Sequence, residues 1–322
     1  MIFGIILIIL ILAAAGLCLY CFNTCFYSVN KQPQDPYCPL HGEQYTQLEK
    51  QIYACTRRME QVAYEPVQIK SFDGLTLCGR YYHVKDGAPV KIIFHGYRSF
   101  ALRDAAGGFG MSQKMGINVL AIDQRAHGNS EGHVITFGIW ERRDCHSWIQ
   151  YINERFGKET PIILSGLSMG AATVLMAATL PMPSNVQCIL ADCPYSSPGA
   201  IIQKVCQDSH MPSRLAYPFI RLAARLLGGF NLEQCSALMG AAISSVPILL
   251  LHGEDDRFVP CSMSEEIDEV SDDTTTLVTF PDAGHGLCYM MHPEAYEMAV
   301  FDFLRQFPAL EEYIPTNKEE AK

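Results

Sequence analysis

Residues 161–173 read PIILSGLSMGAAT, in which a short apolar run leads into small residues around Ser168. The apolar run predicts a buried strand, and the alanine-rich stretch after Ser168 predicts a helix that begins at the next residue. Glycines on both sides of Ser168 leave room for a sharp turn where the strand and the helix approach closely. Because the start of a helix favours negative charge, this stretch predicts an exposed serine nucleophile at the turn.

A second copy of the same G-x-S-x-G pattern occurs at residues 128–132, which read GNSEG around Ser130. This copy follows the polar segment DQRAHG, whereas a nucleophile at a strand–helix turn needs an apolar strand before it. No helix is predicted to begin at Ser130. We therefore interpret Ser130 as a loop residue and assign the nucleophile to Ser168.

Apolar runs of strand length alternate with helix-length segments through the main part of the chain. Continuous apolar runs such as VKIIF and PILLL are typical of parallel strands that are covered on both faces. The alternation predicts an open, mostly parallel α/β sheet with functional residues at the carboxyl ends of its strands. The eight predicted strands are residues 66–71, 75–83, 90–95, 117–123, 161–166, 187–192, 247–252 and 275–280, and predicted helices include 43–62, 139–156, 169–180 and 293–307.

A serine nucleophile needs a histidine to accept its proton and a carboxylate to orient that histidine. His285 follows the last predicted strand and lies between two glycines, so its ring can turn toward the sheet. His292 starts the final predicted helix and is interpreted as a surface residue. Asp255 and Asp256 both follow the preceding strand, and the residues alone leave the choice between them open.

Acyl transfer also needs two backbone N–H groups that stabilise the negative oxygen of the tetrahedral intermediate. The N–H of Met169, directly after the nucleophile, is one candidate. The other candidate is the N–H of Tyr97, in the loop after the third strand, where Gly96 allows a sharp turn.

The amino terminus predicts a membrane anchor over residues 1–27. Residues 2–22 contain no charged residue, and as a helix they would span roughly 30 Å, the thickness of a hydrocarbon core. A cleaved signal peptide would carry a Lys or Arg before the apolar run, and none is present here, so an uncleaved anchor is predicted. The aromatic residues near its far end are expected at the membrane interface: Tyr20, Phe22, Phe26 and Tyr27.

We expect the catalytic domain on the cytoplasmic side of the membrane. The first basic residue, Lys31, follows the anchor, and basic residues favour the cytoplasmic side. The thirteen cysteines are scattered and odd in number, which is more typical of a reducing compartment than of a secreted chain. The nearest metal-ligand pattern lacks a second pair, so no metal or organic cofactor is expected; it consists of Cys18, Cys21 and Cys25.

The rest of the chain is predicted to form a linker, a leading helix, a helical cap and a polar tail around the core domain. Residues 28–64 predict a proline-containing linker and a leading helix, and residues 65–195 and 246–310 predict the core. Residues 196–245 separate two strands by far more than the dozen or so residues that a crossover needs. This insertion contains the amphipathic block SRLAYPFIRLAARLLGGF and predicts a helical cap, whereas residues 311–322 are expected to form a polar tail.

A net charge of −10 argues against nucleic-acid binding, which needs clustered Lys and Arg. The expected partners are therefore a small-molecule or lipid-like acyl substrate and, through the first helix, the membrane. The sequence leaves the oligomeric state open.

Six motifs together resemble those of α/β-hydrolases, in the family's order: FHGYRS, AIDQRAHGNSEG, LSGLSMGAAT, ADCPYSS, LLLHGEDDRFVP and PDAGHG. The resemblance covers about residues 66–308 and is greatest to bacterial membrane-anchored hydrolases grouped with serine aminopeptidase-like and lysophospholipase-like enzymes. It implies the α/β-hydrolase fold, and it assigns the acid to Asp256 and the base to His285. The chain departs from the family at Ala126, where relatives usually carry glycine.

The residues and the resemblance together predict a serine hydrolase that cleaves an acyl ester through Ser168, His285 and Asp256. The anchor and the apolar cap favour a lysophospholipid or a monoacylglycerol as the substrate. Two alternatives stay open: a peptidase or amidase that uses the same triad, and an inactive membrane-tethered binding module.

Overall fold

The computed structural model describes residues 2–28, 35–38, 42–271 and 273–315. Parts of the predicted linker and most of the predicted polar tail lie outside these residues. Eight strands form one sheet in the order β1-β2-β4-β3-β5-β6-β7-β8, and β2 is antiparallel to both of its neighbours. Each predicted strand is present with small shifts at its ends: β1 (Glu65–Lys70), β2 (Thr76–Tyr82), β3 (Val90–Phe94), β4 (Asn118–Ile122), β5 (Ile162–Leu167), β6 (Val186–Asp192), β7 (Ile248–Gly253) and β8 (Thr275–Phe280). The predicted fold is confirmed.

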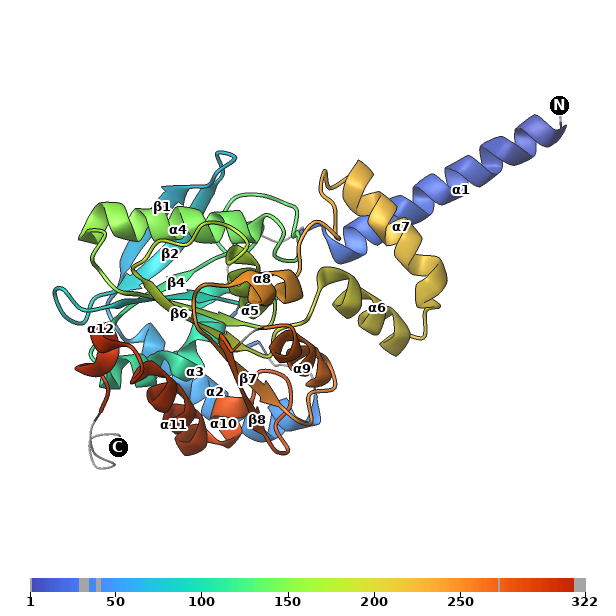
Figure 1. Ribbon diagram of the computed structural model, residues 1–322. Helices are drawn as coiled ribbons and strands as arrows, with labels where there is room; N and C mark the ends of the chain where they lie inside the picture. Colours follow the sequence, from blue (N-terminus) through green and yellow to red (C-terminus); the bar gives the residue numbers. More distant parts are fainter. Residues whose placement is uncertain (1, 29–34, 39–41, 272, 316–322) are drawn as a thin grey trace.

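Helices cover both faces of this sheet (Figure 1). The helices α4 (Glu141–Phe156) and α5 (Met169–Ala177) pack on one face, and α3 (Ala101–Lys114) and α11 (Pro293–Leu304) pack on the other. Because side chains alternate along a strand, β3 serves both layers: Ile92 joins the core on the α5 side and Ile93 joins the core on the α3 side. Shorter helices complete the layers: α8 (Ala237–Ile243), α9 (Ser262–Glu269), α10 (Cys288–Met291) and α12 (Pro308–Glu311).

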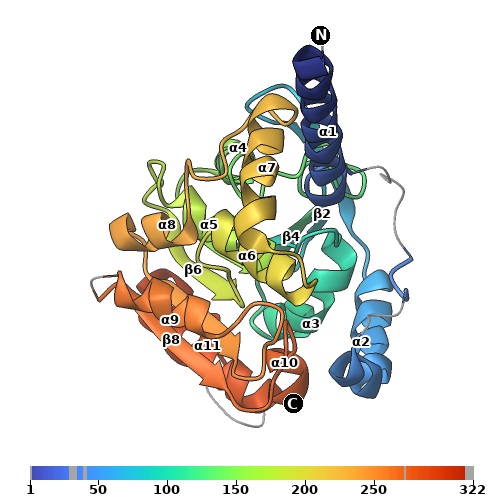
Figure 2. The same cartoon turned by 90° about the vertical axis from the view of Figure 1, so that its right-hand side faces the viewer.

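Two longer helices lie in the segment between β6 and β7, α6 (Pro198–Asp208) and α7 (Ser213–Leu226). The hydroxyl of Ser197 caps α6 by accepting the N–H of Ala200. The amphipathic block of the sequence is α7, and it lies beside the first helix of the chain in both views (Figures 1 and 2). We retain the name cap for residues 196–245 as a prediction.

The first helix, α1 (Ile2–Cys25), is long and apolar enough to cross a membrane. Most of its side chains are exposed, and it projects away from the sheet (Figure 1). Its last turn is different, because Phe22 and Phe26 are buried in the protein. The ring of Phe26 packs edge-on against Phe137 and Phe230, with centroids 5.8 and 5.2 Å away. These two phenylalanines fill the seam between α1 and the main domain, and their place at the membrane interface stays a prediction.

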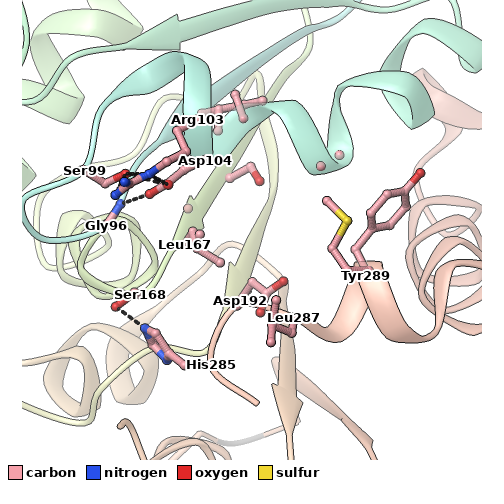
Figure 3. A pocket seen from close by; sticks show the side chains of 18 of the residues that line it. Gly96, Ser99, Arg103, Asp104, Leu167, Ser168, Asp192, His285, Leu287 and Tyr289 are labelled. Carbon is pink, nitrogen blue, oxygen red and sulfur yellow. Dashed lines mark hydrogen bonds and ion pairs between the residues drawn. The ribbon is translucent and has the colours of Figure 1, made fainter. Parts of the chain in front are cut away.

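A leading helix, α2 (Glu43–Glu60), packs against α3 on the side of the sheet away from α4. It covers one side of the cavity that opens at the carboxyl ends of β3, β5 and β6, which Figure 3 shows from close by.

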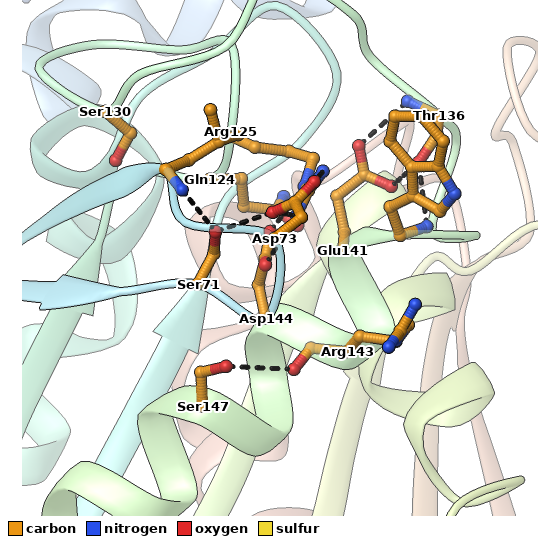
Figure 4. A network of polar contacts seen from close by, with 12 residues as sticks. Ser71, Asp73, Gln124, Arg125, Ser130, Thr136, Glu141, Arg143, Asp144 and Ser147 are labelled. Atoms are coloured by element: carbon orange, nitrogen blue, oxygen red, sulfur yellow. Dashed lines mark hydrogen bonds and ion pairs between the residues drawn. The ribbon is translucent and has the colours of Figure 1, made fainter. Parts of the chain in front are cut away.

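A buried ion network holds the loop after β4 (Figure 4). Arg125 is 1% exposed, and its guanidinium donates to both carboxylate oxygens of Asp144 at 2.6 and 2.7 Å. The same guanidinium donates to Asp73 at 3.0 and 3.1 Å. The next residue, Ala126, adopts φ 63°, a conformation in which glycine is the less strained residue. The backbone is therefore strained at Ala126, the position at which the sequence departs from the family pattern.

We predict that Arg125→Met destabilises the protein by roughly 3–5 kcal/mol, because it leaves the buried carboxylate of Asp144 without its counterion. Urea unfolding of the full chain in detergent measures this change. The matched control is Arg221→Met, which removes an exposed ion pair with Glu233 and should cost less than about 1 kcal/mol. Equal losses in the two variants would contradict the prediction.

Candidate active site

The turn between β5 and α5 forces Ser168 into a strained conformation, with φ 54° and ψ −114°. The two flanking glycines allow this turn because no side chain fits there. A Cβ on Gly166 would lie 2.2 Å from the carbonyl carbon of Gly170, and a Cβ on Gly170 would lie 2.1 Å from the oxygen of Phe94. The backbone N–H of Ser168 donates to the carbonyl of Asp192 at 2.8 Å. The hydroxyl is thereby held at the carboxyl edge of the sheet.

The structure brings the predicted histidine and aspartate to this serine. His285 lies in the loop after β8, and its Nε2 is 3.0 Å from the Oγ of Ser168 (Figure 3). Its Nδ1 is 2.7 Å from Oδ2 of Asp256, which lies in the loop after β7. Ser168 and Asp256 are buried, whereas Asp255 is half-exposed beside Arg257. A continuous chain of hydrogen bonds thus joins the three predicted residues.

The surroundings of Asp256 keep its carboxylate ionised. Its Oδ1 accepts the backbone N–H groups of Phe258 and Val259 at 2.9 and 2.8 Å. Burial alone would raise the pKa of Asp256, but the hydrogen bonds from His252 and His285 lower it to about 2. An ionised Asp256 requires that Nδ1 of His285 carry the proton. Nε2 is then free to accept the proton of the Ser168 hydroxyl.

The loop after β3 carries the predicted oxyanion donor, and α3 fixes this loop. The N–H of Gly96 donates to Oδ2 of Asp104 at 2.7 Å, and the hydroxyl of Ser99 donates to Oδ1 at 2.6 Å (Figure 3). Tyr97 lines the same cavity as Ser168. Among the described residues, no hydrogen bond engages the backbone N–H of Tyr97 or of Met169. Both N–H groups are therefore available to a ligand at Ser168.

The second G-x-S-x-G serine has a structural role instead. Ser130 is buried, its hydroxyl donates to the carbonyl of Asp123 at 2.5 Å, and it accepts the N–H of Cys78 at 2.8 Å. The first contact closes the loop after β4 on itself, and the second ties this loop to the antiparallel strand β2.

A third side chain lies close to the histidine and the aspartate. The Sγ of Cys193 and the ligand atoms of Asp256 and His285 all lie within 4.8 Å of one another, a grouping that could hold a metal ion. Metal ligation would need a thiolate, and burial raises the pKa of the Cys193 thiol well above its usual value. The donor set therefore fits a hydrogen-bonded histidine and aspartate better than a metal centre.

Sequence reasoning missed a contact from α2 to the histidine loop. The hydroxyl of Tyr45 donates to the backbone carbonyl of His285 at 2.5 Å. The side chain of Gln44 donates to Oδ2 of Asp255 and to the carbonyl of Asp282, both at 3.1 Å. The sequence predicts α2 as a helix, but no local pattern indicates which distant loop it contacts.

Sequence reasoning also missed a contact from the end of α1 to the loop after β3, which carries Tyr97 and is called the oxyanion loop below. The hydroxyl of Tyr97 donates to the carbonyl of Cys25, and the guanidinium of Arg98 donates to the carbonyl of Thr24, both at 2.8 Å. These two side chains satisfy carbonyls that the end of a helix leaves without partners. The candidate membrane helix therefore ends against the active-site loop.

Comparisons with known proteins agree with this fold. The family model described as "Serine aminopeptidase, S33" matches residues 89–230, which include Ser168 but less than half of the chain. An esterase of Pyrococcus furiosus superposes with a TM-score of 0.61 at 25% identity, over 78% of this chain and 93% of its own. The chain belongs to the α/β-hydrolase superfamily. The structure of Est1E from Butyrivibrio proteoclasticus with bound ferulic acid shares the fold at 20% identity and a TM-score of 0.56, over 74% of this chain and 98% of its own.

A curated relative is less informative about activity. The uncharacterised protein YqkD of Bacillus subtilis is 26% identical over 191 residues, which are 59% of this chain and 63% of its own length. The α/β-hydrolase chain therefore matches less than two thirds of this relative.

We predict that Tyr45→Phe lowers kcat by roughly fivefold with little change in KM, because the loss of about one hydrogen bond loosens the His285 loop. Steady-state hydrolysis of a 4-nitrophenyl ester measures both constants. Tyr53→Phe on the same helix is the control, since the Tyr53 hydroxyl contacts Glu49 and not the site. Unchanged kcat in Tyr45→Phe would show that the contact does not position the histidine.

Proposed function

We propose that this α/β-hydrolase is a membrane-anchored serine hydrolase that cleaves acyl esters through Ser168, His285 and Asp256. The observation that carries the proposal is the chain of hydrogen bonds from Asp256 through His285 to Ser168. This arrangement matches the order and the roles of a nucleophile, a base and an orienting acid. The similarity to the Pyrococcus furiosus esterase favours esters among acyl substrates.

In the acylation step, the Oγ of Ser168 attacks the ester carbonyl while Nε2 of His285 takes its proton. The ionised Asp256 stabilises the imidazolium that forms. The carbonyl oxygen becomes negative and accepts the N–H groups of Tyr97 and Met169. The intermediate then expels the alcohol, to which His285 donates the proton, and an acyl-serine results.

In the deacylation step, His285 removes a proton from water as the water attacks the acyl carbonyl. The same two N–H groups stabilise the second negative oxygen. The Oγ of Ser168 leaves and takes back a proton from His285. The products of this step are a carboxylic acid and the free enzyme.

The substrate class is inferred from the first helix, whereas the reaction is inferred from the triad. Lysophospholipids and monoacylglycerols are the lipid esters that a membrane anchor favours. A peptidase or amidase would use the same triad, and the matching family description names an aminopeptidase. Comparing the rates of hydrolysis of matched acyl esters and aminoacyl amides distinguishes an esterase from a peptidase or amidase. A preference for amides would contradict the ester proposal. An inactive binding module would hydrolyse neither.

We predict that a fluorophosphonate probe labels the wild-type chain and that Ser168→Ala abolishes this labelling, because Ser168 is the activated hydroxyl. Gel fluorescence of the full chain in membranes measures the labelling. Ser130→Ala is the matched control and should keep the label, since Ser130 is bonded to backbone groups away from His285. Labelling that persists in Ser168→Ala would assign the nucleophile elsewhere.

We also propose that α1 anchors the chain in a membrane with the hydrolase domain in the cytoplasm. The exposed Cys38 follows the helix and reports on this orientation. In intact cells a membrane-impermeant maleimide should leave Cys38 unlabelled and should label it after lysis. Cys38→Ser identifies the signal of this residue among the other thiols. Labelling of Cys38 before lysis would place the domain outside the cytoplasm.

A further inference from the structure

The cavity beside Ser168 ends in polar groups that the proposed reaction does not use. Its volume is about 240 Å³, and it runs from Ser168 and His285 along β5 toward the interior of the sheet, under α3. The polar side chains of its inner part are Lys91, Ser165, Asp192 and Tyr296. A cavity made only for an unsubstituted alkyl chain would be lined by apolar side chains throughout.

Lys91 is the second residue of the central strand β3, level with Ile163 of β5. Its side chain is 5% exposed. Within the described part of the chain, its ammonium has neither a hydrogen bond nor an ion pair. Burial lowers the pKa of Lys91 to about 8, and the electrostatic influence of Cys188 and Asp192 only partly opposes this.

Asp192 provides an unpaired acceptor in the same cavity. It ends β6, and its backbone carbonyl accepts the N–H of Ser168, so the carboxylate lies close to the nucleophile. Its Oδ2 accepts the hydroxyl of Tyr296 at 2.9 Å. Its Oδ1 is buried and has no partner among the described residues. Figure 3 shows Asp192 on the cavity wall beside Leu287.

The helix that covers these groups leaves space above them. Gly107 and Gly108 of α3 line the cavity. A Cβ on Gly108 would lie 3.8 Å from Nζ of Lys91, and a Cβ on Gly107 would lie 3.3 Å from Cε of Met290. A larger side chain at Gly108 would occupy the space beside the ammonium, and one at Gly107 would press on Met290 at the cavity wall. The cavity is therefore lined by the ammonium-bearing side chain of Lys91 and by the carboxylate-bearing side chain of Asp192.

We propose that this inner part of the cavity is a subsite for a hydroxyl-bearing chain of the ester substrate. The hydroxyl oxygen accepts a hydrogen bond from Lys91, and the hydroxyl proton is donated to Asp192. A hydroxyl satisfies both groups because it is donor and acceptor at once. The subsite rests on the proposed ester hydrolysis, and it favours hydroxylated esters over esters of unsubstituted alkyl chains. The hydroxylated chain belongs either to the acid or to the alcohol of the ester, and the experiment separates these sources.

Two pairs of esters test the subsite in the full chain. The first pair is 4-nitrophenyl 6-hydroxyhexanoate and 4-nitrophenyl hexanoate, which place the hydroxyl on the acid. The second pair is 6-hydroxyhexyl butanoate and hexyl butanoate, which place it on the alcohol. In one pair the wild type should have a kcat/KM about tenfold higher for the hydroxylated ester, since a hydrogen bond to a charged group discriminates to that extent.

Substitutions then assign the preference to the buried groups. In Lys91→Met the ratio of the two kcat/KM values should fall to about one, because the donor is lost while the length of the side chain is kept. Lys91→Gln retains a neutral donor and should give an intermediate ratio. Lys158→Met removes an exposed lysine after α4 and should leave the wild-type ratio. Thermal melting of each variant establishes that it is folded.

The inference is overturned if the wild type prefers the unsubstituted ester in both pairs, or if Lys91→Met keeps the wild-type ratio. A binding measurement separates this result from failure of the proposed reaction. Titration of the full chain with 1,6-hexanediol and with 1-hexanol should show tighter binding of the diol, and Lys91→Met should remove the difference. Diol binding that depends on Lys91, without hydrolysis of any ester or labelling of Ser168, would retain the subsite and reject the reaction. Equal binding of both alcohols, together with no hydrolysis, would reject both.

Discussion

The arrangement of the site depends on the close approach of α5 to β3 and β5. A side chain at Gly166 or Gly170 would overlap backbone atoms by more than an ångström, so glycine is required at both positions. This approach gives Ser168 its left-handed φ and places the next N–H, that of Met169, at the start of a helix. It also brings the loop after β3 beside the serine, because Gly170 lies against the carbonyl of Phe94. The nucleophile and both candidate oxyanion donors follow from this one contact.

The segment that precedes the sheet supports the site on two sides. The end of α1 is bonded to Tyr97 and Arg98 of the oxyanion loop, and the start of α2 is bonded to the loop of His285 through Tyr45. A fragment that begins at residue 31 would lack the carbonyls to which Tyr97 and Arg98 donate. Activity measured on such a fragment would report on a loop with altered support. The full chain is therefore the form in which the chemistry of this site should be compared with that of other hydrolases.

Local pattern determines what the sequence could predict. The strands and the turn at Ser168 follow from short runs of residues, and the structure contains them. The residues alone could not choose between Asp255 and Asp256, because the difference lies in burial and in the backbone donors that face Asp256. Contacts such as that of Tyr45 with His285 join residues far apart in the chain and leave no local pattern. The position of Lys91 in the cavity could not be predicted either. VKIIF has the pattern of an apolar strand, and this pattern does not indicate what its single charged side chain contacts.

Location and selectivity are determined by different parts of this molecule. The apolar surface of α1, with the exposed Leu215, Leu222 and Leu226 of the neighbouring α7, favours a position at a lipid surface. The cavity beside Ser168 is more polar, since its lining includes a buried ammonium and a carboxylate with one unpaired oxygen. An unsubstituted acyl chain in that space would displace water from both groups and give neither a partner, which costs free energy. The first helix is consequently a weaker guide to the substrate than the cavity, because its apolar character does not extend to the cavity.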